Sequence, residues 1–168
     1  MQFIRCTQKL FKELKAKPTE SEPEGGCLGS WHANLIVVER KKCVLFTNDA
    51  TLYSFFVPGL KKLHFKILDE IFRQNLIRCL KNEELLQKHI EKVMDEYQRI
   101  EFAKTNNRSV LGSMNDLTAH LKYWIDDSGG LKMVNIRDLN KRLNRILMGA
   151  HKYISGIDML RSKLDNYG

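Results

Sequence analysis

Three strand-like segments between residues 31 and 57 limit the fold of this chain more than any other feature. Trp31–Val38 and Cys43–Thr47 are apolar runs of strand length, and the polar residues Glu39–Lys42 separate them. This pattern predicts a β-hairpin. A third apolar run, Thr51–Val57, ends at a Pro-Gly pair. Together the segments predict a β meander, and the rest of the chain must cover at least one face of that sheet.

The remaining elements follow from the spacing of apolar residues. Phe3–Thr7 and Ile100–Ala103 read as strands. Apolar residues that recur every three or four positions predict helices near residues 8–14, 68–80, 85–97, 114–124, 135–147 and 157–164. We therefore expect an α+β fold, a small and mostly antiparallel sheet with about five to six helices packed on it. All of residues 1–168 form one domain in this interpretation, and residues 18–29 form a flexible loop of Pro, Glu and Gly.

Positive charge is concentrated at the two ends of the sequence. The net charge is +8; residues 1–17 carry five Lys or Arg against one Glu, and residues 132–168 carry eight against three Asp. The middle, residues 18–131, is nearly balanced, with 15 basic and 16 acidic residues. If the ends meet in space, they form one positive face suited to a phosphate-bearing partner. The alternative is a basic surface that only keeps the protein in solution.

A dense polar run after the strand at residue 100 is the strongest candidate for a binding site. Backbone N–H groups at a helix start favour anions, and the run adds two cations and several donors. Ser113 followed by Asp116 predicts a helix that begins there with a capping box. The predicted anion-binding residues are Lys104, Thr105, Asn107, Arg108, Ser109 and Ser113. The alternative is that these side chains only tie the loop down. The Gly-rich frame of a Walker A loop is missing.

A second candidate lies on the first strand of the hairpin. His32 and Asn34 share one face of that strand, because side chains alternate along it. If this face points into a cleft, His32 is a candidate general base that Asp49 orients, and Asn34 positions a substrate. The alternative is a hydrogen-bonded histidine at the edge of the sheet. The five histidines are scattered, so we expect no metal site and no cofactor.

A basic helix face near the C-terminus is a third candidate. Arg137, Lys141 and Arg145 are spaced to lie on one side of the expected helix, which begins at Asn135. Such a face suits the backbone of a nucleic acid. Aromatic residues are scarce near it, so the stacking of unpaired bases has less support there. An ordinary solvated helix face is the alternative.

The remaining features favour a protein of the cytoplasm. The chain opens directly into strand-like sequence rather than a signal peptide, and no apolar run approaches the length of a membrane span. The four cysteines form no CxxC pair, and they read as reduced core residues. We therefore expect no membrane partner. The oligomeric state is left open.

Three blocks of the sequence resemble a bacterial domain family of unknown function. They are Arg5–Leu10, Leu28–Leu35 and the run Asn107–Asp116, of which the last is the most specific. The resemblance extends over nearly the whole chain and implies a bacterial, cytoplasmic setting. It implies no activity, cofactor or catalytic residue.

These observations support three functional hypotheses. The first is a module that binds a phosphate-rich partner such as nucleic acid through the polar turn and the basic terminal segments. The second is an enzyme of the toxin or defence type that acts on a nucleotide or phosphodiester, with His32 as acid or base and Lys104 and Arg108 holding the phosphate. The third is a protein-interaction domain without catalysis, in which an exposed apolar patch draws on Trp31, Phe55, Phe56 or Trp124.

Overall fold

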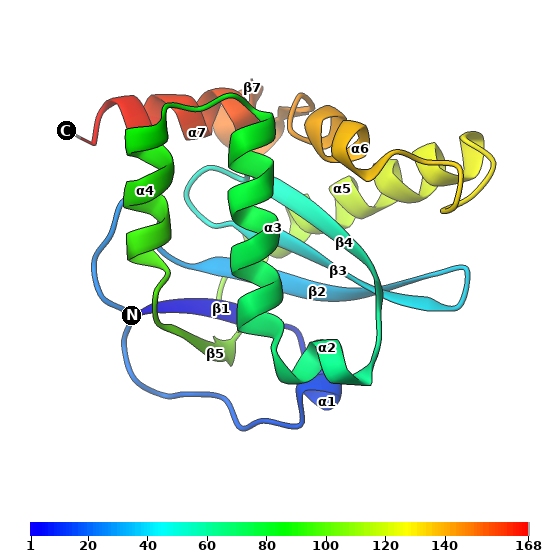
Figure 1. Ribbon diagram of the computed structural model, residues 1–168, viewed down its shortest axis with the longest axis horizontal. Helices are drawn as coiled ribbons and strands as arrows, with labels where there is room; N and C mark the ends of the chain where they lie inside the picture. Colours follow the sequence, from blue (N-terminus) through cyan, green and yellow to red (C-terminus); the bar gives the residue numbers. More distant parts are fainter. Residues whose placement is uncertain (168) are drawn as a thin grey trace.

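A five-stranded sheet runs through the centre of the computed structural model, which describes residues 1–167 (Figure 1). Its strands lie in the spatial order β4-β3-β2-β1-β5. The strands are β1 (Gln2–Cys6), β2 (Trp31–Val38), β3 (Lys41–Asn48), β4 (Ser54–Leu60) and β5 (Ile100–Lys104). The predicted hairpin and meander are confirmed, because β2, β3 and β4 pair antiparallel in chain order.

The other half of the sheet corrects the prediction of a mostly antiparallel sheet. β1 pairs parallel with β2 on one side and parallel with β5 on the other, so the sheet is mixed. Parallel neighbours need long crossover connections. The chain supplies one through α1 (Gln8–Leu14) and the following loop, and a second, longer one between β4 and β5.

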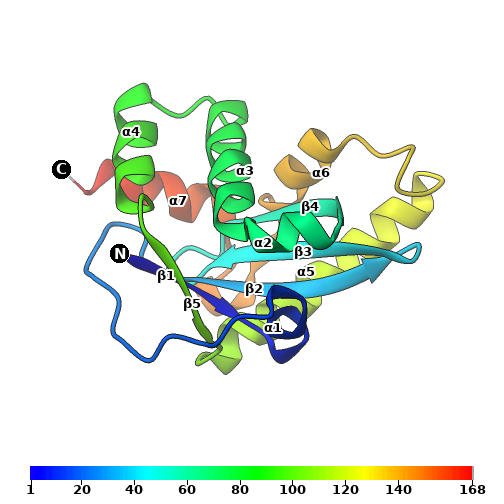
Figure 2. The same cartoon turned by 60° about the horizontal axis from the view of Figure 1, so that its bottom comes forward.

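Helices cover both faces of the sheet. In Figure 2 the sheet lies between α3 and α4 on one side and α5 on the other. The first face packs against α1, α2 (Lys62–Lys66), α3 (Leu68–Asn82), α4 (Gln87–Glu96) and α7 (Gly156–Asp165). The second face packs against α5 (Arg108–Asp127) and α6 (Ile136–Leu143). These are the seven α-helices of residues 1–167. A short hairpin of β6 (Leu147–Met148) and β7 (Ile154–Ser155), with a 3₁₀ turn between them, joins α6 to α7.

Side chains along β2 point alternately to the two faces of the sheet, and each face has its own core. Trp31, Ala33 and Leu35 point into the first core, and Ile36 and Val38 point into the second. The Trp31 ring packs edge-on against Phe55 and Phe72 in the first core. Its indole N–H donates to the hydroxyl of Tyr97, at 2.8 Å. The large aromatic side chains therefore organise the interior.

This burial corrects the predicted interaction patch. The side chains proposed for that patch belong to the two cores, and the most exposed of them keeps only 8% of its surface accessible. They are Trp31, Phe55, Phe56 and Trp124. An apolar contact surface cannot be built from them, because burying them against the sheet is what stabilises the fold.

Both free edges of the sheet are covered. On β4, the side-chain oxygens of Asn140 and Asn144 accept the backbone N–H groups of Phe56 and Ser54, at 2.8 and 2.7 Å. On β5, the N–H of Thr19 donates to the carbonyl of Phe102, at 2.8 Å. The segment 18–29, expected to be a flexible loop, thus runs along the edge of the sheet. Such cover blocks pairing with another chain at that edge.

An ion pair between a buried carboxylate and an exposed arginine joins the end of α3 to the segment after α6. The Glu83 side chain is 1% exposed, and its two oxygens accept from the Arg145 guanidinium at 3.0 and 2.7 Å. Arg161 of α7 donates to the Glu83 carbonyl, at 3.3 Å. The carboxylate raises the pKa of Arg145 through its hydrogen bonds. One residue, Glu83, therefore connects three parts of the chain through its carboxylate and its backbone carbonyl.

We expect Arg145→Ala to lower the free energy of unfolding by about 1–3 kcal/mol, because it leaves the buried Glu83 carboxylate without its bidentate partner. Urea denaturation followed by tryptophan fluorescence measures the change. Arg137→Ala is the matched control, since Arg137 is exposed and makes no ion pair within residues 1–167. Equal stability of the two variants would contradict a structural role for the pair.

Candidate site at the carboxyl ends of β1 and β5

The connections that leave β1 and β5 diverge to opposite faces of the sheet. After β1 the chain enters α1, whose Leu10 packs in the first core. After β5 it enters α5, whose Val110 and Met114 pack in the second core. Figure 2 shows α1 and the start of α5 beside the ends of these two strands. In sheets with parallel strands, ligands bind at such a switch point, because the diverging connections leave a crevice outside the carboxyl ends.

A groove of about 450 Å³ occupies this position. Cys6, Gln8 and Phe11 line it from β1 and α1, and Lys104 and Thr105 line it from the end of β5. Pro18 adds a third wall from the edge loop. Lys104 and Thr105 are among the predicted anion-binding residues, whereas the other lining residues were not predicted as part of a site. Their role depends on β1 lying beside β5, a pairing that no local pattern encodes.

The polar turn is shorter than predicted, and the predicted helix start at Ser113 is wrong. The structure begins α5 at Arg108, with Asn107 as the N-cap whose side-chain oxygen accepts the N–H of Val110 at 3.1 Å. Ser109 therefore lies in the first helical turn. Ser113 is the sixth residue of the helix, is largely buried, and lines a different groove beside β6. It does not belong to the turn.

Cations at the turn are free to meet a ligand. Lys104 and Arg108 are exposed, and neither forms an ion pair with any residue of 1–167. The Arg5 guanidinium donates to the Lys104 carbonyl, at 3.1 Å, and also lies over the Phe3 ring. The start of the 20-residue helix α5 adds partial positive charge from its first N–H groups. Lys104, Arg108 and the helix start lie within one short stretch of the chain, and each favours a negative group, although only Lys104 of the two cations lines the groove.

His32 holds this turn in place. Its Nδ1 lies 2.6 Å from an Asp49 oxygen, and its Nε2 accepts the backbone N–H of Asn106 at 3.3 Å. With Nε2 as an acceptor, Nδ1 is the ring nitrogen that donates to Asp49. The imidazole has no exposed surface and both nitrogens are bonded. The predicted contact with Asp49 is present, while the role of His32 as a general base stays a prediction.

Asn34 fixes the other side of the crevice. Its side-chain oxygen accepts the hydroxyl of Thr7, at 2.8 Å, directly after β1. Asn34 and His32 lie on one face of β2, as predicted, and they bond the connections that follow β1 and β5, respectively. Asn34 thus bonds the protein's own loop in the structure. The predicted role of Asn34 in positioning a substrate stays a prediction.

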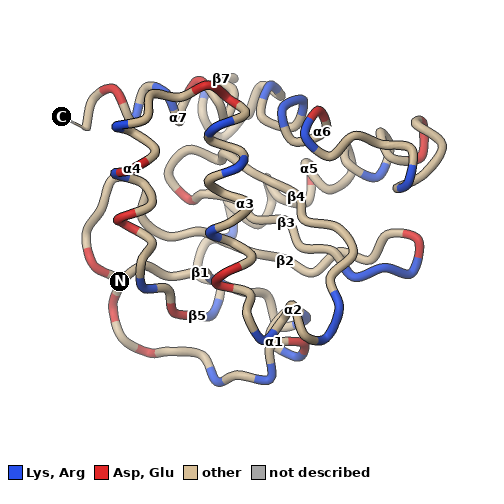
Figure 3. The backbone as a smooth tube through the Cα atoms, viewed as in Figure 1, with Lys and Arg blue, Asp and Glu red and all other residues tan. Residues whose placement is uncertain are grey.

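The basic face predicted near the C-terminus lies elsewhere. α6 packs against β4, the edge strand opposite β5. Figure 3 shows the cations of α1 at one end of the molecule and those of α6 and α7 at the other, so the two basic segments do not form one face. α6 ends at Leu143, beyond which Arg145 is bonded to Glu83. Arg137 and Lys141 remain on α6 itself, with Arg137 exposed and Lys141 half-buried.

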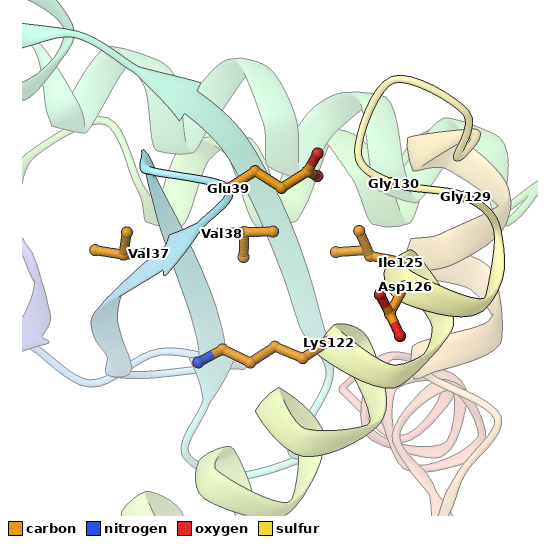
Figure 4. A pocket seen from close by; sticks show the side chains of 8 residues that line it. All are labelled: Val37, Val38, Glu39, Lys122, Ile125, Asp126, Gly129 and Gly130. Atoms are coloured by element: carbon orange, nitrogen blue, oxygen red, sulfur yellow. The ribbon is translucent and has the colours of Figure 1, made fainter.

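A second groove, of about 490 Å³, carries a less convergent set of groups. It lies between the tip of the β2–β3 hairpin and the end of α5 (Figure 4). The Lys122 amine and the carboxylates of Glu39 and Asp126 are spread around its rim rather than directed at one point. Glu39 already accepts the N–H of Leu131, at 2.6 Å. We therefore place the candidate site at the carboxyl ends of β1 and β5.

Neither the cysteines nor any group of metal-binding side chains forms a second candidate site within residues 1–167. All four cysteines are free and buried, and burial raises the pKa of the Cys79 thiol to about 12. Burial also raises the pKa of Cys6, the thiol in the wall of the groove, so it stays uncharged. Across residues 1–167, no cluster of three or more His, Cys, Asp or Glu side chains is arranged to hold a metal ion.

None of the helices in residues 1–167 is long and apolar enough to span a bilayer.

Comparison with known proteins identifies a family but no individual similar protein. No curated protein and no solved structure matches the chain. The family described as a domain of unknown function, DUF6933, matches residues 3–159. That range includes β5, the turn, the groove and all of β1 except Gln2. The chain therefore belongs to the DUF6933 family, a family of domains of unknown function.

Proposed function

We propose that this protein binds a phosphate-bearing partner, with nucleic acid as the leading class, at the turn between β5 and α5. The observation that supports this most strongly is the pair of exposed, unpaired cations, Lys104 and Arg108, on either side of the cap of α5. A phosphate there meets two full charges and the free N–H groups of the helix start. The crevice between the diverging connections gives the ligand a concave surface.

The N-terminal basic segment adds to this site. α1 forms one wall of the groove, and its segment carries four more positive than negative charges. Its one acidic residue, Glu13, is paired with Lys42 of β3, at 2.7 Å. A chain of phosphates that leaves the turn toward α1 therefore meets further lysines. The C-terminal basic segment is not needed, because the cations of α6 and α7 lie at the other end of the molecule from α1 (Figure 3).

An enzyme that acts on a phosphodiester is the second candidate. The short contact between His32 and Asp49 supports it, since such a pair can orient an imidazole for proton transfer. The same imidazole is fully buried and bonded to Asn106, so a substrate can reach it only if that bond opens. This requirement makes the binding function the simpler proposal.

Replacing both cations, Lys104→Gln with Arg108→Gln, should weaken the binding of labelled single-stranded RNA or DNA and flatten its salt dependence. Two lost phosphate contacts reduce the slope of log K against log salt by about 1.4, measured between about 50 and 200 mM NaCl by fluorescence anisotropy. Lys132→Gln is the control, because Lys132 is an exposed lysine between α5 and α6. Absence of binding by the unmodified protein at about 50 mM NaCl would overturn the proposal.

Variants of the His32 pair separate the two functions. If His32 only positions the turn, His32→Ala lowers the free energy of unfolding by about 1–3 kcal/mol and weakens binding, since two buried hydrogen bonds are lost. Asp49→Asn, which keeps an oxygen to accept from Nδ1, should then bind nearly as well as the unmodified protein. A nuclease assay on the same variants provides the contrast. Phosphodiester cleavage that both substitutions abolish, in folded protein, would support the enzyme instead.

A further inference from the structure

The groove beside the turn has an apolar half and a polar half. Phe11 and Pro18 supply apolar surface from α1 and the edge loop, and both are half-buried against the protein. Lys104 and Thr105 from the end of β5, and Gln8 from α1, supply polar groups. The side chains of Gln8 and Thr105 make no hydrogen bond with any residue in the described range 1–167. The groove thus offers apolar surface for a flat ring and polar groups for the edge of that ring, beside Lys104.

The size of the groove selects among phosphate-bearing ligands. Its volume of about 450 Å³ falls within the range of about 300–1,000 Å³ typical of small-molecule sites. An unpaired base can enter such a groove and stack on an aromatic side chain, whereas the bases of a duplex remain stacked on each other. A bare phosphate would leave the apolar half empty.

We propose that the groove binds one unpaired nucleotide, with its base against Phe11 and Pro18 and its phosphate at Lys104 beside the start of α5. Gln8 and Thr105 then contact the polar edge of the base. This inference rests on the proposed function, because it assigns the phosphate to the same turn. It adds that the partner is single-stranded and that a lone nucleotide is sufficient to fill the site.

Substitutions of Phe11 test the base site separately, because the Phe11 ring takes no part in the proposed phosphate contacts. Phe11→Leu keeps an apolar side chain in the first core but removes the flat ring, and Phe11→Tyr restores the ring. We expect Phe11→Leu to weaken the binding of a single strand of about 12 nucleotides by roughly 5- to 100-fold, the usual effect of losing one stacked base. Phe11→Tyr should bind as tightly as the unmodified protein, and a duplex of the same sequence should bind more weakly than the single strand.

A competition series with the unmodified protein gives an independent readout that does not depend on how a variant folds. Adenosine monophosphate should displace the labelled strand at lower concentration than ribose 5-phosphate, and inorganic phosphate should be the weakest competitor. Thermal melting of each Phe11 variant shows whether a loss of binding reflects a loss of folded protein.

The outcomes distinguish this inference from the proposed function. If the variant with both cations replaced loses binding while Phe11→Leu binds normally, or if ribose 5-phosphate competes as well as adenosine monophosphate, the base site is wrong and phosphate binding stands. Duplex binding as tight as single-strand binding would also overturn the base site. If neither strand nor mononucleotide binds at about 50 mM NaCl, both proposals fail.

Discussion

The parallel pairing of β1 with both of its neighbours decides where the rest of the molecule lies. A strand with two parallel partners needs a crossover on each side, so α1 and the β4–β5 connection must both carry the chain back across the sheet. The connections after β1 and β5 then leave toward opposite faces. The groove between them follows from this divergence rather than from any single side chain.

Two polar side chains of β2 turn this crevice into a fixed surface. His32 accepts the N–H of Asn106, and Asn34 accepts the hydroxyl of Thr7, so the connections after β5 and β1 are both attached to β2. Buried polar groups must find partners, and here each partner belongs to a loop at the candidate site. A turn held in this way loses little conformational freedom when a ligand binds, which favours affinity.

Net charge alone does not identify the basic residues available to a ligand. Arg145 neutralises the buried Glu83, and Lys42 is paired with Glu13. Lys104 and Arg108 are exposed and make no ion pair within residues 1–167. The two basic ends of the sequence lie at opposite ends of the structure, so the charge excess is shared between surfaces rather than concentrated on one. The pairing of each cation, more than the total of +8, identifies the candidate site.

The sequence by itself determined the elements whose signals are local. Alternation specified the hairpin, and helical spacing specified the stripes of α3 and α5. The helix predicted to begin at Asn135 does begin there, with Asn135 as its N-cap, because its partner Asp138 lies within one turn. Only the tertiary structure decided the parallel direction of β1, the position of Phe11 beside Lys104, and the pairing of Arg145 with Glu83. These depend on contacts between residues far apart in the chain, such as the 62 positions between Glu83 and Arg145. The start of α5 depends on a local signal and on a long-range contact. Asn107 and Ser113 are both residue types that cap helices. The hydrogen bond that the Asn106 N–H donates to His32 holds the chain just before Asn107, which is the N-cap.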